Sequence, residues 1–184
     1  MRVAAVVLAA GSSTRLGEPK QLVRLQSETL LERAVRVARE AGCSPIVVVL
    51  GAAAPLILAA CELGDAFIVV NEDWAEGLGS SIRAGVAALR DVEGCVVMTC
   101  DMPAVTSVHL RSLLEPAEVT ASSYAGRRGV PAYFPAENFR SLMEVSGDVG
   151  ARDQLRSARC VELIGGELDI DSAADLHRAR ELFG

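Results

Sequence analysis

The feature that most constrains the fold is a regular alternation between two kinds of segment. Short runs of aliphatic, often β-branched residues alternate with longer segments whose apolar residues recur at helical spacing. The first four runs are continuously apolar, which is typical of parallel strands covered on both faces by crossover helices. The expected strands are Val3–Leu8, Pro45–Leu50, Phe67–Asn71, Cys95–Cys100, Glu118–Ser123, Ala132–Phe134 and Cys160–Ile164. The pattern predicts an α/β fold, with a three-layer, Rossmann-like, mostly parallel and doubly wound sheet of about seven strands.

Two of the expected helices begin with recognisable capping signals. Thr29 stands three residues before Glu32, the spacing of a capping box, and an apolar stripe follows. The last helix is expected to begin at Ser172, with Asp175 three residues further on.

Hydrophobic residues make up 51% of the 184-residue chain and aromatic residues only 4%. This length and content suit one core, so residues 1–184 are expected to form a single domain.

Charge and cysteine content argue against several classes of protein. Eighteen Lys and Arg residues against 24 Asp and Glu give a net charge of −6, so nucleic acid is not an expected partner. Five cysteines without a CxxC pair indicate neither a disulfide framework nor a zinc site.

The nearly apolar run Ile46–Cys61 is short and interrupted, so no membrane span is expected. Residues Val3–Ala10 after Arg2 read as a signal peptide or as a buried strand. The loop that follows favours the strand, and the cytoplasm is the expected compartment.

The segment after the first expected strand has the composition of an anion-binding loop. Ala9, Ala10 and Gly11 leave the backbone open to a ligand, and successive N–H groups of such a turn can cradle an anion. Hydroxyl donors follow at Ser12, Ser13 and Thr14. Arg15 and Lys20 add a guanidinium fork and a mobile point charge, both suited to phosphate. The alternative is an ordinary basic surface turn, but the coincidence of small residues, cations and position favours a phosphate site.

Two familiar phosphate-binding motifs are absent. Five residues separate Gly11 from Gly17 and no Gly-Lys pair follows, so the P-loop spacing is not met. Gly77 and Gly79 are followed by Ile82 where a dinucleotide-binding fingerprint requires a third glycine. The sequence therefore predicts neither an ATPase P-loop nor a dinucleotide site.

Carboxylates stand where a strand-end metal site would need them. Asp101 directly follows the expected strand Cys95–Cys100. A second acid is available from Asp169 or Asp171, which share one face of an extended segment. Mg²⁺ typically takes one or two protein carboxylates together with nucleotide phosphates. These acids could instead cap helices or close turns, and the residues alone leave the choice between Asp169 and Asp171 open.

Glycine and paired serines open the helix after the third expected strand. Gly79, Ser80 and Ser81 make a donor-rich surface suited to an anion or to the edge of a base. The alternative is that the serines only cap an ordinary helix. Trp74 is read as a packing residue in preference to a stacking platform.

The segment from Leu8 to Lys20 resembles a known family signature. Its pattern is Leu-Ala-Ala-Gly-x-Ser-x-Arg-x-Gly-x-x-Lys, which is similar to that of the NTP-transferases with the molybdenum cofactor nucleotidyltransferase fold. The continuation Gly17-Glu-Pro-Lys-Gln-Leu22 is similar to the cytidylyltransferase branch. The guanylyltransferase branch usually has Leu-Ala-Gly-Gly in place of Leu8-Ala9-Ala10-Gly11 and a second Arg beside the position of Arg15. This chain has neither. The resemblance covers nearly the whole chain and implies a nucleotide-diphospho-sugar transferase-like fold.

The resemblance also implies roles for individual residues. It implies a nucleotide site made by Leu8, Ala9, Ala10, Gly11, Ser12, Ser13, Gly79, Ser80 and Ser81. Arg15 would meet the leaving pyrophosphate, and Lys20 the α-phosphoryl oxygens and the incoming phosphate. Asp101 would be the principal ligand of Mg²⁺, with Asp171 as the second ligand.

The implied reaction transfers CMP from CTP to the phosphate of molybdopterin and releases pyrophosphate. A molybdoenzyme or its chaperone is the partner that the family suggests. The alternatives are a guanylyltransferase, a sugar- or alcohol-phosphate cytidylyltransferase of the same fold, and a catalytically silent nucleotide-binding module that senses or delivers the cofactor.

Matches to the cytidylyltransferase branch continue towards the C-terminus, at Gly129–Pro131 and Gly147–Arg152, which border the acceptor side in that family. Arg152 is expected either to meet a phosphate or to stay on a helix surface, and Asp148 to cap a helix. Solvated loop charges are expected at Arg127 and Arg128, and core or surface roles at His109 and His177.

Overall fold

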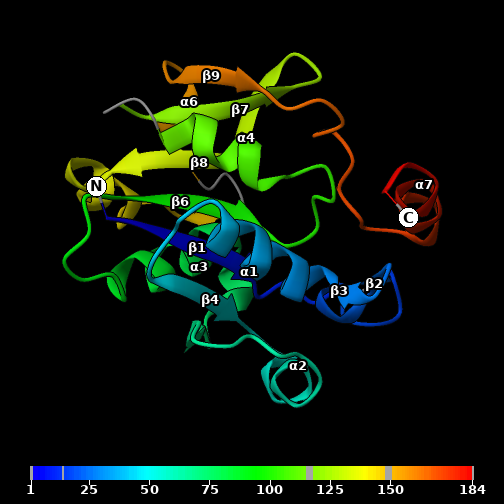
Figure 1. Cartoon of the computed structure of the whole chain (residues 1–184). Helices are drawn as coiled ribbons and strands as arrows, with labels where there is room; N and C mark the ends of the chain where they lie inside the picture. The colour runs from blue at the N-terminus through cyan, green and yellow to red at the C-terminus, as the bar shows by residue number, and fades with distance from the viewer. Residues whose placement is uncertain (1, 14, 115–117, 148–150, 184) are drawn as a thin grey trace.

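A seven-stranded sheet forms the centre of the molecule (Figure 1). The computed structural model describes residues 2–13, 15–114, 118–147 and 151–183. The strands are β1 Val3–Ala9, β4 Ile46–Leu50, β5 Phe67–Val70, β6 Gly94–Thr99, β7 Thr120–Tyr124, β8 Arg127–Pro135 and β9 Arg159–Glu162. They are ordered β5-β4-β1-β6-β8-β7-β9, and β8 alone in this sheet runs against its neighbours. The predicted fold class, a mostly parallel sheet of about seven strands, is confirmed.

Helices cover both faces of this sheet. The helices are α1 Leu30–Glu40, α2 Ala54–Ala60, α3 Leu78–Ala87, α4 Ser107–Leu114, α5 Phe139–Leu142, α6 Arg152–Leu155 and α7 Ala173–Phe183, and of these α7 lies apart from the sheet. Alternate residues of β1 point to opposite faces. Val7 belongs to the apolar cluster that contains Leu31 of α1 and Leu110 of α4. Val6 belongs to the cluster formed with Ile82 of α3 on the other face. The two clusters make the three layers.

The predicted capping box is present at the start of α1. The Thr29 hydroxyl accepts a hydrogen bond from the Glu32 N–H at 3.1 Å, and the Glu32 carboxylate accepts one from the Thr29 N–H at 2.8 Å. At α7, the Ser172 N–H donates to the Asp175 carboxylate at 2.8 Å. This satisfies backbone donors that a helix start otherwise leaves unpaired.

The last helix lies beside a small hairpin, away from the main sheet. In Figure 1, α7 stands next to β2 (Arg24–Leu25) and β3 (Glu28–Thr29). Fully buried Ala179 of α7 shares a third apolar cluster with Leu25 and with Ile170. This packing carries the segment before α7 to the carboxyl ends of β1 and β6.

Three elements differ from expectation. Strand β5 is not covered on both faces, because it is the edge strand of the sheet, and Phe67 is 67% exposed. The apolar run after β4 includes helix α2, whose Leu56 is also exposed. Strand β8 is longer than predicted, and its pairing with β7 shifts between Ala121 and Ser122. In the described part of the chain, no helix is long and apolar enough to cross a membrane.

Candidate active site

The loop after β1 is held in place by a buried glutamine. Gln21 is 1% exposed, and its Nε2 donates to the carbonyl oxygens of Ala9 at 2.6 Å and Gly11 at 3.2 Å. Two loop carbonyls are therefore occupied by protein donors and turned away from an anion. The Ser13 hydroxyl accepts a hydrogen bond from the Lys20 N–H at 3.0 Å, which ties the two ends of the loop together. This role of Gln21 was not predicted from the sequence. The signal available in the sequence was a polar residue, Gln21, between Lys20 and the apolar pair Leu22-Val23.

Lys20 bridges two carboxylates that are distant in the sequence. Its Nζ donates to Asp101 Oδ2 at 2.5 Å and to Asp171 Oδ1 at 2.9 Å. The Arg15 guanidinium donates to Asp171 Oδ2 at 3.3 Å. Lys20 is the only lysine in the sequence. The structure thus brings together all four residues predicted as catalytic or metal-binding.

The electrostatics of this cluster favour charged partners. Burial alone would lower the pKa of Lys20, but the carboxylates of Asp101 and Asp171 outweigh it and raise that pKa above its usual range. Burial, together with the same two carboxylates, raises the pKa of Asp169 to about 6. Asp169 therefore carries its charge less readily than an ordinary aspartate. It is Asp171 that pairs with both Lys20 and Arg15.

A backbone contact explains why Asp171 reaches the cluster. The Ile170 N–H donates to the carbonyl oxygen of Asp101 at 3.0 Å, and the Ile170 side chain is fully buried. The extended segment before α7 is thereby docked on the end of β6. Its neighbouring acid, Asp169, lines a different pocket from the one beside Gly11.

The two carboxylates fit a divalent cation. Asp101 Oδ1 is buried and has no hydrogen-bond partner among the described residues. Asp101 and Asp171 both pair with one cationic atom, Lys20 Nζ. Carboxylate oxygens are the ligands that Mg²⁺ and Mn²⁺ prefer, and one or two protein carboxylates suffice when phosphates supply the rest. Within the described residues, no three His, Cys, Asp or Glu side chains are grouped as a metal site by themselves.

A pocket of about 340 Å³ lies beside Lys20 and is called here the nucleotide pocket. Its walls are Leu8, Ala9, Ala10, Gly11, Ser12, Lys20, Gln21, Trp74, Ala75, Gly77, Leu78, Ser81, Thr99 and Asp101. Six of the predicted nucleotide-binding residues are among them, namely Ser81 and five residues from the end of β1 and the loop that follows. The other three, Ser13, Gly79 and Ser80, are not part of the described lining. A Cβ on Gly11 would meet no atom within 4 Å, so the loop is open at that point.

Two serines of α3 are held by an asparagine whose role was not predicted from the sequence. Asn71 Nδ2 donates to Ser80 Oγ at 2.9 Å and to Ser81 Oγ at 3.1 Å. Ser80 Oγ also lies 2.9 Å from the carbonyl oxygens of Asp73 and Gly77, either of which can accept its proton. Ser80 is therefore engaged in holding the start of α3, whereas Ser81 also faces the nucleotide pocket.

Glycines near the pocket permit close backbone approaches. A Cβ on Gly51, directly after β4, would lie 2.4 Å from the carbonyl oxygen of Ala10 and 3.0 Å from Trp74. A Cβ on Gly79 would lie 2.9 Å from the Cα of Ser146. Gly51 thus allows the loop to pass beside β4, and Gly79 allows α3 to pack on the chain at residue 146. The contact at Gly51 connects segments far apart in the sequence, which is why it was missed.

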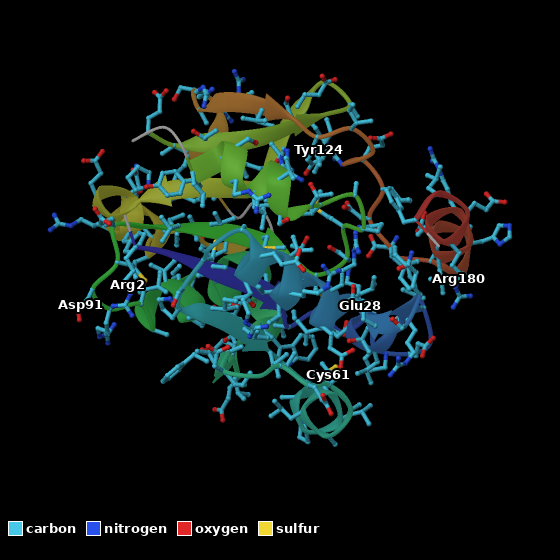
Figure 2. The ribbon with its side chains drawn as sticks, in the orientation of Figure 1. Arg2, Glu28, Cys61, Asp91, Tyr124 and Arg180 are labelled. Atoms are coloured by element: carbon cyan, nitrogen blue, oxygen red, sulfur yellow. The ribbon has the colours of Figure 1, made fainter. Side chains whose placement is uncertain are left out.

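A second pocket, of about 520 Å³, adjoins the first and is called here the acceptor pocket. Its walls are Leu78, Ile82, Thr99, Asp101, Met102, Tyr124, Arg127, Arg128, Gly129, Val130, Ala151, Arg152, Leu155 and Asp169. Leu78, Thr99 and Asp101 line both pockets. Tyr124, labelled in Figure 2, comes from the end of β7. Arg127 and Arg128, expected as solvated loop charges, are exposed and line this pocket. The predicted donor Thr14 and the predicted cap Asp148 lie outside the described residues.

Among the described residues, the cysteine and histidines considered for covalent catalysis are not arranged as a nucleophile and its base. Burial, followed by the charge of Asp101, raises the pKa of Cys100 to about 12, so its thiol stays protonated. His109 is 8% exposed and lies 2.8 Å from Ser122 Oγ, as a core residue. His177 is exposed and lies 3.4 Å from Glu181. The charged cluster is instead suited to holding phosphates and a metal.

Comparison with known proteins agrees with this geometry. Residues 5–162 match the family model described as MobA-like NTP transferase domain. The chain is 34% identical to nicotine blue oxidoreductase of Paenarthrobacter nicotinovorans, over 96% of this chain and 95% of that protein. It is 31% identical to the molybdenum cofactor cytidylyltransferase of Escherichia coli, over 55% of this chain and 52% of that protein.

A solved structure is similar over the whole length. Rv0371c of Mycobacterium tuberculosis, crystallised in complex with manganese, superposes with a TM-score of 0.82 at 32% identity, over 98% of this chain and 99% of that one. The similarity is consistent with the divalent-metal dependence typical of the family. Because the family model covers most of the chain and the fold is shared with this solved structure, this protein belongs to the MobA-like NTP transferase family and is a nucleotidyltransferase.

Proposed function

We propose that the protein transfers CMP from CTP to the phosphate of a molybdopterin-type acceptor in a Mg²⁺-dependent reaction. The observation that carries this proposal is the position of Lys20, whose Nζ bridges Asp171 and Asp101, the latter a residue that lines both pockets. A donor and an acceptor, both anionic, can meet there. The choice of CTP rests on Gly17–Leu22, which is similar to the cytidylyltransferase branch, and on Leu8-Ala9-Ala10-Gly11, which differs from the Leu-Ala-Gly-Gly of the guanylyltransferase branch.

On the nucleotide side, the chain's task is to neutralise and align phosphates. The loop from Ala9 to Ser13 binds the β- and γ-phosphates through backbone and hydroxyl donors. Arg15 stabilises charge on the leaving pyrophosphate, and Lys20 holds the α-phosphoryl oxygens. Lys20 stays protonated because its pKa is raised by the two carboxylates, so it acts as a fixed positive charge and not as a base.

Asp101 and Asp171 are the residues that would hold Mg²⁺. When bound, the ion would supply Lewis-acid stabilisation of phosphate oxygens. The unpartnered Oδ1 of Asp101 and the pairing of both carboxylates with one amine support this assignment. Before the phosphates bind, the Lys20 amine is paired with both carboxylates.

On the acceptor side, a phosphate oxygen of the acceptor attacks the α-phosphorus. The new P–O bond forms as the bond to the bridging oxygen of the β-phosphate breaks, and pyrophosphate leaves with that electron pair. The protein contributes positioning and charge stabilisation, with no covalent intermediate. We also propose that the chain acts as one unit, because Asp171, outside the matched residues 5–162, completes the cluster. The partner expected from the family is a molybdoenzyme or its chaperone.

A second candidate follows from the long alignment with nicotine blue oxidoreductase. It is an oxidoreductase that uses the same fold. The experiment below also distinguishes a guanylyltransferase, a sugar- or alcohol-phosphate cytidylyltransferase, and a silent nucleotide-binding module.

Pyrophosphate release separates these candidates. Purified protein is incubated with Mg²⁺, purified molybdenum cofactor and either CTP or GTP. We expect release with CTP, dependent on the cofactor and at least tenfold slower with GTP, a difference of about 1.4 kcal/mol. Faster release with GTP than with CTP would identify GTP as the donor nucleotide. Release from CTP only with a sugar or alcohol phosphate would change the acceptor. No release with either nucleotide would reject nucleotidyl transfer to this cofactor in favour of the silent module or the oxidoreductase.

A further inference from the structure

Four arginines surround a hollow beyond the acceptor pocket. The hollow has a volume of about 480 Å³ and is called here the arginine trough. Its walls are Gly126, Arg127, Arg128, Arg152, Asp153, Leu155 and Arg156, from the β7–β8 turn, β8 and the region of α6. Such a concentration of positive charge is unusual on a chain whose net charge is −6.

The arginines are positioned by contacts that leave their charge uncompensated. Arg127 lies over the Tyr124 ring, 5.3 Å from its centroid. Arg128 Nε donates to the carbonyl oxygen of Ala158 at 3.2 Å and to Cys160 Sγ at 2.9 Å. Aromatic, carbonyl and thiol groups orient a guanidinium without neutralising it.

Ion pairs in the trough are few. Arg156 pairs with Asp153 at 3.1 Å. Among the ion pairs of the described residues, none involves Arg127, Arg128 or Arg152. Three positive charges therefore face one hollow, which is the electrostatic condition for binding an anion.

The trough is continuous with the acceptor pocket. Arg127, Arg128, Arg152 and Leu155 line both. The acceptor pocket is also lined by Asp101 and by apolar residues, among them Ile82, Met102 and Val130. A single ligand can therefore lie with one end at Asp101, its body on the apolar walls and its other end among the arginines.

We propose that the arginine trough binds a second anionic group of the acceptor. The acceptor then has a phosphate that reacts near Asp101, a mainly apolar or ring-shaped body, and a phosphate, carboxylate or similar acid at the far end. This inference rests on the proposed function, because it takes the pocket at Asp101 as the acceptor's place. Continuity of the hollow with that pocket favours a small molecule over an acidic protein segment, which would not need to reach Asp101.

A binding experiment tests this with probes of known charge. Propyl phosphate has one phosphate, and the bisphosphates of 1,4-butanediol, 1,6-hexanediol and 1,8-octanediol have two phosphates at increasing separation. Each is titrated calorimetrically into the wild-type protein with Mg²⁺ and CMP present. We expect at least one bisphosphate to bind about tenfold more tightly than propyl phosphate, because it gains charge-assisted hydrogen bonds to guanidinium groups.

Variants then locate the gain. The double variant Arg127→Gln/Arg152→Gln should reduce the advantage of that bisphosphate to less than about threefold, and Arg152→Gln alone should give an intermediate value. Arg178→Gln, on the exposed surface of α7, is the matched control and should keep the full advantage. All three changes replace exposed side chains, and thermal unfolding verifies that each variant is folded.

Several outcomes would overturn the inference. They are equal affinity for all probes, an advantage that survives in the double variant, or tight binding of a polyglutamate peptide without any preference for a bisphosphate. Pyrophosphate release from CTP is measured separately on the same samples. Release without a bisphosphate preference rejects the trough alone. A bisphosphate preference without release rejects nucleotidyl transfer and keeps the anion site.

Discussion

The nucleotide pocket and the arginine trough both carry positive charge, but they hold it in opposite ways. In the first, Lys20 and Arg15 are already paired with Asp101 and Asp171. In the second, Arg127 and its neighbours are oriented by a ring, a carbonyl oxygen and a thiol. A nucleotide must therefore exchange partners with carboxylates, which a metal can take over, whereas an anion in the trough meets free guanidinium groups. Nucleotide binding should depend strongly on the metal, and anion binding in the trough should not.

The largest effect is expected from removing the shared cation. Lys20→Ala should lower the rate of pyrophosphate release by about 10²- to 10³-fold, because one charged donor to the reacting phosphate is lost. Lys20→Arg, which keeps the charge in a wider planar group, should fall between the Lys20→Ala variant and the wild type. Thermal unfolding should change far less than turnover. Unchanged turnover in Lys20→Ala would reject the role of Lys20 in catalysis. It would also remove the difference proposed here between the nucleotide pocket and the arginine trough.

The metal dependence of the nucleotide pocket is tested at Asp101. Asp101→Asn should raise the Mg²⁺ concentration for half-maximal activity by about 10- to 100-fold, since a neutral amide oxygen binds Mg²⁺ more weakly than a carboxylate. The advantage of a bisphosphate probe over propyl phosphate, which reports the trough alone, should be the same with and without Mg²⁺ in this variant. An identical Mg²⁺ titration in variant and wild type would count against metal ligation by Asp101.

The loop itself is tested at Gln21. Gln21→Glu replaces the amide that donates to the carbonyl oxygens of Ala9 and Gly11 with an acceptor, so those carbonyls are released towards the phosphates. The KM for CTP should rise by about tenfold, with a smaller change in kcat. Gln154→Glu is the matched control, because the side-chain oxygen of Gln154 is also buried without a hydrogen-bond partner among the described residues. A KM that rises equally in both variants would show a general effect of a buried acid.

The serines of α3 separate structural from nucleotide contacts. Ser80→Ala should lower the free energy of unfolding by about 1–2 kcal/mol, because a hydrogen bond of buried Asn71 loses its acceptor. Ser81→Ala should weaken CTP binding more than stability, since Ser81 faces the nucleotide pocket. Chemical denaturation and calorimetry measure the two quantities. The reverse ranking would exchange the roles of the two serines.

The smallest effect is a pH dependence of stability at His109 of α4, which packs against β7. Burial lowers the pKa of His109, so the folded protein binds this proton more weakly than the unfolded chain. The stability contributed by neutral His109 is present above about pH 6.5 and is lost as the pH falls below it. As the pH is lowered from 7.5 to 5.5, the unfolding free energy of the wild type should therefore fall relative to that of His109→Gln. Lys20 should contribute no slope in this range, because its pKa is raised further above it. A constant difference would contradict the assignment.

The sequence alone was sufficient for the features that are local. The strand, the small residues after it and the two cations stand within 20 residues, and Asp101 directly follows its strand. The strand pattern and the capping box of α1 are local in the same way, and both are present in the structure.

The remaining features depend on contacts between distant segments. Asp171 reaches Lys20, in place of Asp169, because Ile170 docks on the end of β6. The contact of Gly51 with Ala10 likewise exists only once β4 lies beside β1. Asn71 gave no signal in the sequence because its serine partners belong to the following helix.

The most direct measurement is a crystal structure of the protein with a non-hydrolysable CTP analogue and Mg²⁺. We expect the triphosphate against residues 9–13, Mg²⁺ on the carboxylates of Asp101 and Asp171, and the Lys20 amine transferred from these carboxylates to phosphate oxygens. A nucleotide bound elsewhere, with the Lys20–Asp101 pair unbroken, would contradict it.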